Sequence, residues 1–118
     1  MFEVFLSFNK LNNNDATIYY IDTHAWYNND IFSKHPILNE LNIIISKSKK
    51  NEIIIIIDFK VPNKNFQYDS FDDGTHYSFY IINDLINFNV WKYFYKSNGS
   101  VGQIYIYHIS FNLDNFII

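Results

Sequence analysis

The sequence contains no cysteine and no arginine, and only three glycines and two prolines. Without cysteine the chain can form neither a disulfide framework nor a thiolate metal site. The glycines (Gly74, Gly99 and Gly102) are too isolated to build a phosphate-binding loop or a dinucleotide fingerprint. The longest apolar run, residues 53–57, is far shorter than the roughly 20 residues that a membrane span requires. These absences exclude several common classes of enzyme and membrane protein.

The N-terminal segment, residues 1–8, is apolar but lacks the features of a secretory signal. No Lys precedes it, Glu3 interrupts it, and no small-residue cleavage site follows. Together with the missing cysteines, this favours the reducing interior of a cell. We therefore expect a cytoplasmic protein with no membrane partner.

Five residue types (isoleucine, asparagine, lysine, phenylalanine and tyrosine) fill more than half of the 118 positions. All five have codons made of A and T alone, so part of this excess reflects an AT-rich gene. The length and a hydrophobic content of 48% are nevertheless those of one packed globular domain, which we expect to span residues 1–118. No cofactor is implied by any motif.

Charge is distributed unevenly along the chain, whose formal net charge is −3. Residues 31–50 have an excess of lysine, whereas residues 65–86 contain four aspartates and no lysine. A negative net charge and the absence of arginine argue against a nucleic-acid partner. The aspartate-rich stretch is instead complementary to a basic protein.

Hydrophobic periodicity predicts one helix and six strands. Apolar residues recur at helical spacing from Ile37 to Ile45, and Pro36 suits the first helical position, so we place a helix at about 36–48. Alternation, or a content of β-branched and aromatic residues, predicts the strands 2–8, 17–24, 52–60, 75–82, 89–96 and 101–112. The run of isoleucines in 52–60 lacks alternation and is typical of a central strand.

The predicted fold is therefore α+β, with order ββαββββ. It contains a mostly antiparallel sheet of five to six strands, with one main helix (about 36–48) on one face. Asn98 and Gly99 favour a type I′ hairpin between the last two strands, and residues 83–88 are compatible with a short helical turn. One helix covers one face only. The other face either closes over a second, minor core or stays open for a partner or a second copy, so a monomer and a homodimer are both compatible with the pattern.

The histidines are the first candidates for catalytic or metal chemistry. Asp22 and His24 lie two positions apart on one predicted strand, and His76 and His108 would join them if their strands were neighbours. Hydrogen-bonded sheet histidines explain the same residues, and no spaced metal-binding pair such as HExxH is present. We assign no catalytic and no metal residue, and we expect a protein that is not an enzyme.

The acidic loop, defined here as residues 68–77, is the best candidate for binding a partner. It is not a calcium loop, because Phe71 stands at the third ligand position and Tyr80 stands where a bidentate glutamate is needed. Carboxylates beside aromatic rings are typical of protein interfaces, although a solvated turn would look similar. The predicted partner-binding residues are Tyr68, Asp69, Phe71, Asp72, Asp73, His76 and Tyr77.

In its overall profile the chain resembles the immunity proteins of bacterial polymorphic toxin systems, including contact-dependent growth inhibition. The shared features are small size, absence of cysteine, acidic charge, an α+β pattern and an AT-rich gene. The resemblance implies an immunity protein that binds a cognate toxin domain, frequently a basic nuclease, and neutralises it by stoichiometric occlusion. It includes no diagnostic motif, so no functional residue is carried over from it.

Two other functions are compatible with the sequence. One is a viral or phage accessory protein that binds a host protein, since such proteins are likewise AT-rich and without motifs. The other is a small enzyme that uses His24, His76 or His108. Neighbouring genes would distinguish the first from an immunity protein, and a cleft that gathers two histidines and a carboxylate would favour the second.

Overall fold

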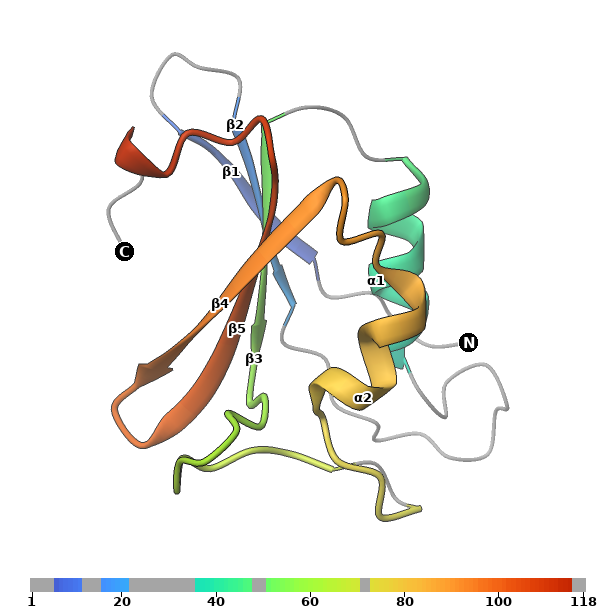
Figure 1. Cartoon of the computed structure of the whole chain (residues 1–118), viewed down its shortest axis with the longest axis vertical. Helices are drawn as coiled ribbons and strands as arrows, with labels where there is room; N and C mark the ends of the chain where they lie inside the picture. Colours follow the sequence, from blue (N-terminus) through green and yellow to red (C-terminus); the bar gives the residue numbers. More distant parts are fainter. Residues whose placement is uncertain (1–5, 12–15, 22–35, 48–50, 71–72, 116–118) are drawn as a thin grey trace.

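The structure is a computed structural model, and it describes residues 6–11, 16–21, 36–47, 51–70 and 73–115 (Figure 1). Within these ranges there are five strands: β1 (Leu6–Leu11), β2 (Ala16–Ile21), β3 (Glu52–Ile57), β4 (Trp91–Asn98) and β5 (Val101–His108). The helical elements are α1 (Pro36–Ser46), the short helix α2 (Phe79–Ile82), and the 3₁₀ turns η2 (Asn83–Leu85) and η3 (Leu113–Asn115). The predicted α+β class is confirmed.

The strands form one mixed sheet in the order β1-β2-β3-β5-β4. β2 and β3 are parallel, with Ile18 beside Ile53, whereas the other three neighbouring pairs are antiparallel. The parallel pair arises because α1 lies between β2 and β3 in the chain and returns it to the same end of the sheet, as in a βαβ unit. β3 is the middle strand, in agreement with its unbroken run of isoleucine.

The predicted order ββαββββ is wrong at one element, because the expected strand 75–82 is absent. Its second half is the helix α2, followed by η2. Phe79, Ile82 and Ile86 all contact the main core, the cluster of buried side chains between the helices and the sheet. Their spacing of three and four residues is the periodicity of a helix rather than of a strand. Aromatic and β-branched residues here favour a strand locally, but the packing of one face onto the sheet outweighs that preference.

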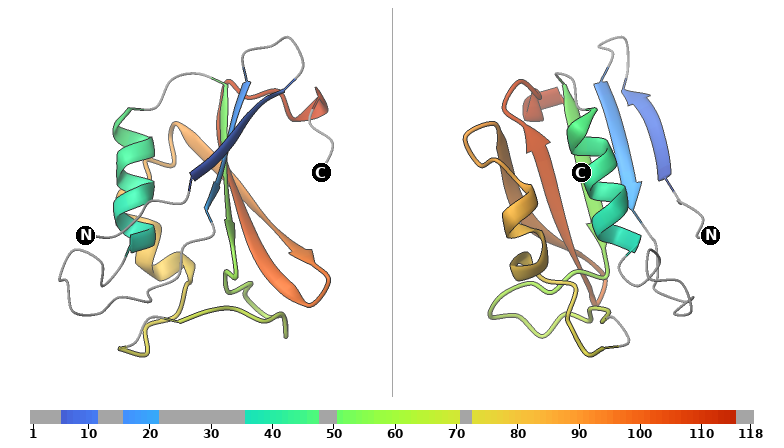
Figure 2. Two further views of the ribbon diagram at one scale, coloured as in Figure 1. Left: turned by 180° about the vertical axis from the view of Figure 1, so that it is seen from behind. Right: turned by 90° about the vertical axis from the view of Figure 1, so that its right-hand side faces the viewer.

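Both helices cover the same face of the sheet, as two views show (Figures 1 and 2). The side of α1 that faces the sheet carries Ile37, Leu41 and Ile44, which belong to the main core. Glu40, on the same side, is fully buried as well. The main core continues into β3 and β5 through their isoleucines, and Trp91 on β4 adds a large buried ring.

The opposite face of the sheet closes over a second, smaller core. Ile53 and Ile55 of β3 contact Tyr105 of β5 there, and Phe111 of the segment after β5 packs against them. This segment and η3 lie on the side of the sheet away from the helices (Figure 1). A second minor core is one of the two arrangements that the sequence left open.

The hairpin between β4 and β5 has a two-residue connection, because Asn98 pairs with Val101. The two central residues are Gly99, which has a φ of 64°, and Ser100, which like Asn98 is not among the residues with positive φ. A single positive φ at the first central residue is the pattern of a type II′ turn. The predicted type I′ turn, which would need a positive φ at both central residues, is therefore wrong.

Several predicted features lie outside the described residues, namely 2–5 of the first strand, Asp22 and His24, and Phe71 and Asp72 of the acidic loop. In the ranges that the structure describes, no helix is both long and apolar enough to cross a membrane.

Candidate functional site

The acidic loop is attached to the sheet through the segment that precedes it. The amide of Gln67 donates to the carbonyl of Ser100 at 2.7 Å, and the amide of Gly102 donates to the carbonyl of Gln67 at 2.9 Å. These two bonds form a parallel bridge between Gln67 and Val101. Gln67 thus pairs with the edge of β5 that β3 occupies as far as Ile57. The chain therefore enters the acidic loop from a fixed position at the lower end of the sheet (Figure 1).

The loop is also closed on itself by backbone hydrogen bonds. The amide of Asp69 donates to the carbonyl of Asp58 at 2.8 Å, and the amide of Tyr77 donates to the carbonyl of Asp69 at 3.0 Å. The amide of Lys60 donates to the carbonyl of Tyr77 at 2.7 Å. These bonds connect both ends of the loop, at Asp69 and Tyr77, to the segment after β3, so the two ends are in position before any partner arrives.

Short-range hydrogen bonds orient the carboxylates of Asp69 and Asp73. Oδ1 of Asp69 accepts from the amide of Ser70 at 2.8 Å, and Oδ1 of Asp73 accepts from the amide of Thr75 at 2.9 Å. Gly74, with a φ of 88°, provides the left-handed residue at the tip. Asp73 is exposed and Asp69 is half-buried, so the loop presents negative charge from a rigid turn.

The rings of Tyr68 and His76 form an exposed pair in the loop. The Tyr68 ring, 38% exposed, meets the His76 ring edge-on with 4.9 Å between centroids. Nδ1 of His76 lies 3.0 Å from Oγ of Ser70, and Nζ of Lys60 lies 5.2 Å from the centre of the Tyr68 ring. The structure thus brings together Tyr68, Asp69, Asp73 and His76 at this end of the sheet.

Tyr77 differs from the other predicted partner-binding residues. Its side chain is 1% exposed and belongs to the main core with Phe59 and Ile82. Its function in this conformation is therefore to fix the end of the acidic loop, and we leave it out of the proposed binding surface. A tyrosine next to an exposed histidine gives no sequence signal for this inward orientation.

The two histidines that the structure describes, His76 and His108, do not form a common site. His76 belongs to the loop at the start of β5, whereas His108 ends β5, and a strand of that length spans roughly 23 Å. Nδ1 of His108 lies 3.1 Å from the amide nitrogen of Ser110 and 2.7 Å from its Oγ, so the ring is occupied by a local contact of its own strand end. Among the described residues, no three His, Asp or Glu side chains are arranged to hold a metal ion.

A buried hydrogen bond lies at the opposite end of the sheet from the loop. The Tyr19 hydroxyl donates to Oε2 of Glu52 at 2.9 Å. Burial, followed by the hydrogen bond and the negative charge of Glu52, raises the pKa of Tyr19 to about 12. Burial also raises the pKa of Tyr95 and of Tyr105. All three hydroxyls stay protonated at neutral pH, and that of Tyr105 donates to Oε1 of Gln103 at 3.3 Å.

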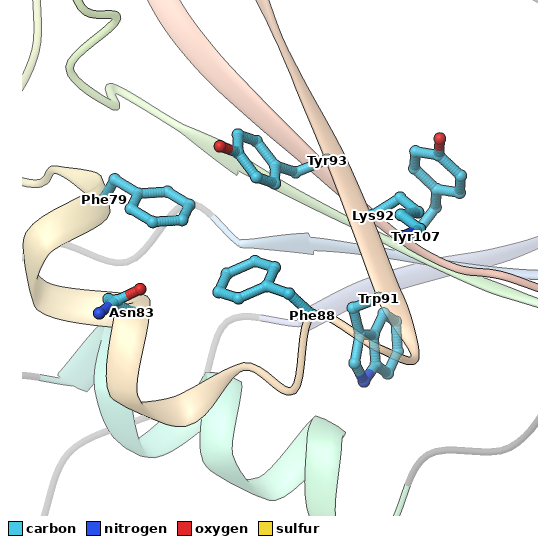
Figure 3. A pocket seen from close by; sticks show the side chains of 7 residues that line it. All are labelled: Phe79, Asn83, Phe88, Trp91, Lys92, Tyr93 and Tyr107. Atoms are coloured by element: carbon cyan, nitrogen blue, oxygen red, sulfur yellow. The ribbon is translucent and has the colours of Figure 1, made fainter.

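A second concave site, which we call the β4 groove, was not predicted from the sequence. It is a pocket of about 490 Å³ lined by Phe79, Asn83, Phe88, Trp91, Lys92, Tyr93 and Tyr107. The rings of Phe79, Phe88 and Tyr93 contact one another, with centroids 4.9–5.7 Å apart. Figure 3 shows these three rings on one side of β4 and Tyr107 on the other. The spacing of Phe79 and Ile82 is compatible with a helix, and predicting α2 from it would have placed Phe79 beside β4, where the groove forms.

Comparisons with protein-family models, with curated proteins and with solved structures find no match to this chain.

Proposed function

We propose that this protein is a cytoplasmic immunity protein that binds a cognate toxin domain, such as a basic nuclease, and occludes it stoichiometrically. The surface that we propose for this contact consists of Tyr68, Asp69, Asp73 and His76. The observation that carries the proposal is the anchoring of the acidic loop: hydrogen bonds to Asp58, Lys60 and Ser100 fix it against the sheet. A loop fixed in this way loses little conformational entropy when it binds.

The chemistry of the loop suits a basic partner. Asp69 and Asp73 carry negative charge in a stretch, residues 65–86, that contains no lysine, and such a surface attracts a positively charged domain over some distance. Tyr68 adds an exposed aromatic ring, the kind of residue that dominates binding energy at protein interfaces. The carboxylates of Asp69 and Asp73 would therefore raise the association rate with a basic toxin domain. The Tyr68 ring and the shape of the loop backbone would lower the dissociation rate.

Co-expression with the toxin domain encoded by the adjacent upstream gene tests this function. The proposal expects the two proteins to co-purify at a 1:1 ratio, and it expects the toxin to lose activity when the immunity protein is equimolar. A matched expression with an unrelated toxin domain controls for non-specific attraction between opposite charges. A toxin that stays fully active with excess protein would contradict the proposal.

A further inference from the structure

We propose that the free edge of β4 binds an extended acidic segment of a partner protein, which adds to the sheet as a sixth strand. This site goes beyond the proposed function and does not depend on it, because it uses the β4 edge and the β4 groove rather than the acidic loop. Its ligand has the opposite charge from the partner proposed for the loop.

β4 is the last strand in the sheet order, so one of its edges has no neighbouring strand in the described part of the chain. The hydrogen bonds of Gly102, on β5, establish which backbone groups of β4 point to this free edge. Its amide donates to Gln67 and its carbonyl accepts from Phe59, so both groups point away from β4.

Backbone groups alternate in direction along a strand, so those of Gln103 and Tyr105 point toward β4. Their partners there are Lys96 and Phe94. By the same alternation, the amides and carbonyls of Tyr93 and Tyr95 point outward, where an added strand would bond to them.

Side chains along the edge define the sequence of such a strand. On the helix side of β4, a side chain of the added strand would contact the groove residues Phe79, Phe88 and Tyr93, whose rings suit apolar side chains (Figure 3). On the other side it meets Lys92, which is exposed, and Lys96, which is half-buried. Since side chains of an extended segment alternate between the two faces, the matching ligand alternates apolar and acidic residues.

A second copy of this chain fits the same edge less well. In an antiparallel pair centred on Phe94, Lys92 of each copy lies opposite Lys96 of the other, and like charges in that position repel. Lysines on an edge strand are a common means of preventing such self-pairing. Charge complementarity therefore points to an acidic segment of another protein.

The test uses a blocked synthetic peptide of about seven residues, a usual strand length, that alternates glutamate with valine. We expect the full-length protein to bind it in calorimetry, and the K92E/K96E variant to bind roughly tenfold more weakly because two charge pairs are reversed. The K47E/K64E variant has the same change in net charge, at exposed residues in the turn after α1 and in the loop after β3, and it should bind like the unaltered protein. Thermal unfolding checks that both variants fold.

Amide hydrogen exchange provides the second measurement. Peptide binding should slow exchange at Tyr93 and Tyr95 but leave Lys92 and Phe94, which already point to β5, unchanged. A peptide that is N-methylated at the residues whose amides would donate to β4 should not bind. Equal binding of the methylated peptide, or equal binding by K92E/K96E, would overturn the proposal.

Three other results would also overturn it: no binding at millimolar peptide, a dimer whose Tyr93 and Tyr95 amides are already protected, and a single-stranded oligonucleotide that displaces the peptide. The dimer would show that a second copy occupies the edge, and the oligonucleotide would show a nucleic-acid site instead. None of these results bears on the toxin, which is assayed separately, so the two proposals can fail independently.

Discussion

The hydroxyl of Tyr19 on β2 donates a hydrogen bond to Oε2 of Glu52 on β3, with 2.9 Å between the two oxygens. The bond joins the two strands of the parallel pair. Glu52 is 4% exposed, so a charged or polar side chain at this position needs a donor. The pair gives the fold a measurable dependence on alkaline pH.

We expect the free energy of unfolding to fall between pH 10 and pH 12 because of Tyr19. Its pKa in the folded protein is about 12, compared with 10.0 for an unperturbed tyrosine. In this range the unfolded chain releases a proton that the folded protein retains, so rising pH favours unfolding, while below pH 10 the contribution is fully present. Solvent screening at this half-buried pair limits the loss to about 1 kcal/mol.

Chemical denaturation at several pH values, with Y19F as the comparison, measures this effect. Y19F lacks the ionisable group and should lose stability less steeply above pH 10. The half-buried Tyr95 and the buried Tyr105 are present in both proteins, so their titration cancels in the comparison. Identical slopes for the two proteins would show that the bond to Glu52 does not hold the proton of Tyr19.

Gly102 should be far less tolerant of alanine than Gly99. A Cβ on Gly102 would lie 2.3 Å from the carbonyl oxygen of Phe59 and 2.9 Å from Cγ2 of Val61, so the backbone must shift. We expect G102A to cost about 3 kcal/mol through overpacking. G99A meets open space and has only a positive φ to accommodate, at about 1 kcal/mol. Equal losses in urea denaturation would contradict this account of the loop anchor.

Tyr77 and Tyr80 form a matched pair for testing which tyrosine belongs to the core. Tyr77 is 1% exposed and Tyr80 is 86% exposed. We expect Y77A to reduce the free energy of unfolding by about 3–5 kcal/mol and Y80A to change it by less than about 0.5 kcal/mol. Thermal or urea unfolding of the two variants gives the comparison. A small effect of Y77A would mean that Tyr77 is free to contact a partner after all.

Elements with a strong hydrophobic period could be predicted from the sequence. The stripe from Ile37 to Ile45 gave the helix α1, and the isoleucine run gave the middle strand, because both patterns arise directly from burial. The α2 segment could not be predicted correctly in this way. Its aromatic and β-branched residues favour a strand, and only the contact of Phe79 and Ile82 with the sheet makes it helical.

The candidate site was predictable in position but not in detail. A stretch that contains aspartates but no lysine marks the acidic loop, since charge density is visible in sequence. The inward side chain of Tyr77 and the bridge from Gln67 to Val101 depend on where β3 ends relative to β5, which is a long-range relationship. The β4 groove was missed for the same reason, because Phe88 and Tyr93 meet Phe79 only once α2 has folded.

The most direct test of the central claim is a titration of the upstream toxin domain with the D69N/D73N variant. Asparagine removes the charge but retains an Oδ1 acceptor for the amides of Ser70 and Thr75, so these two hydrogen bonds should persist. D84N/D114N removes two charges at exposed residues elsewhere and serves as the control.

Isothermal titration calorimetry at low and high salt supplies the dissociation constants. We expect 1:1 binding of the unaltered protein, with an affinity that D69N/D73N lowers about tenfold at low salt and less at high salt. The dissociation constant of D84N/D114N should stay close to that of the unaltered protein. Unchanged affinity of D69N/D73N for the toxin would contradict a contact through the acidic loop.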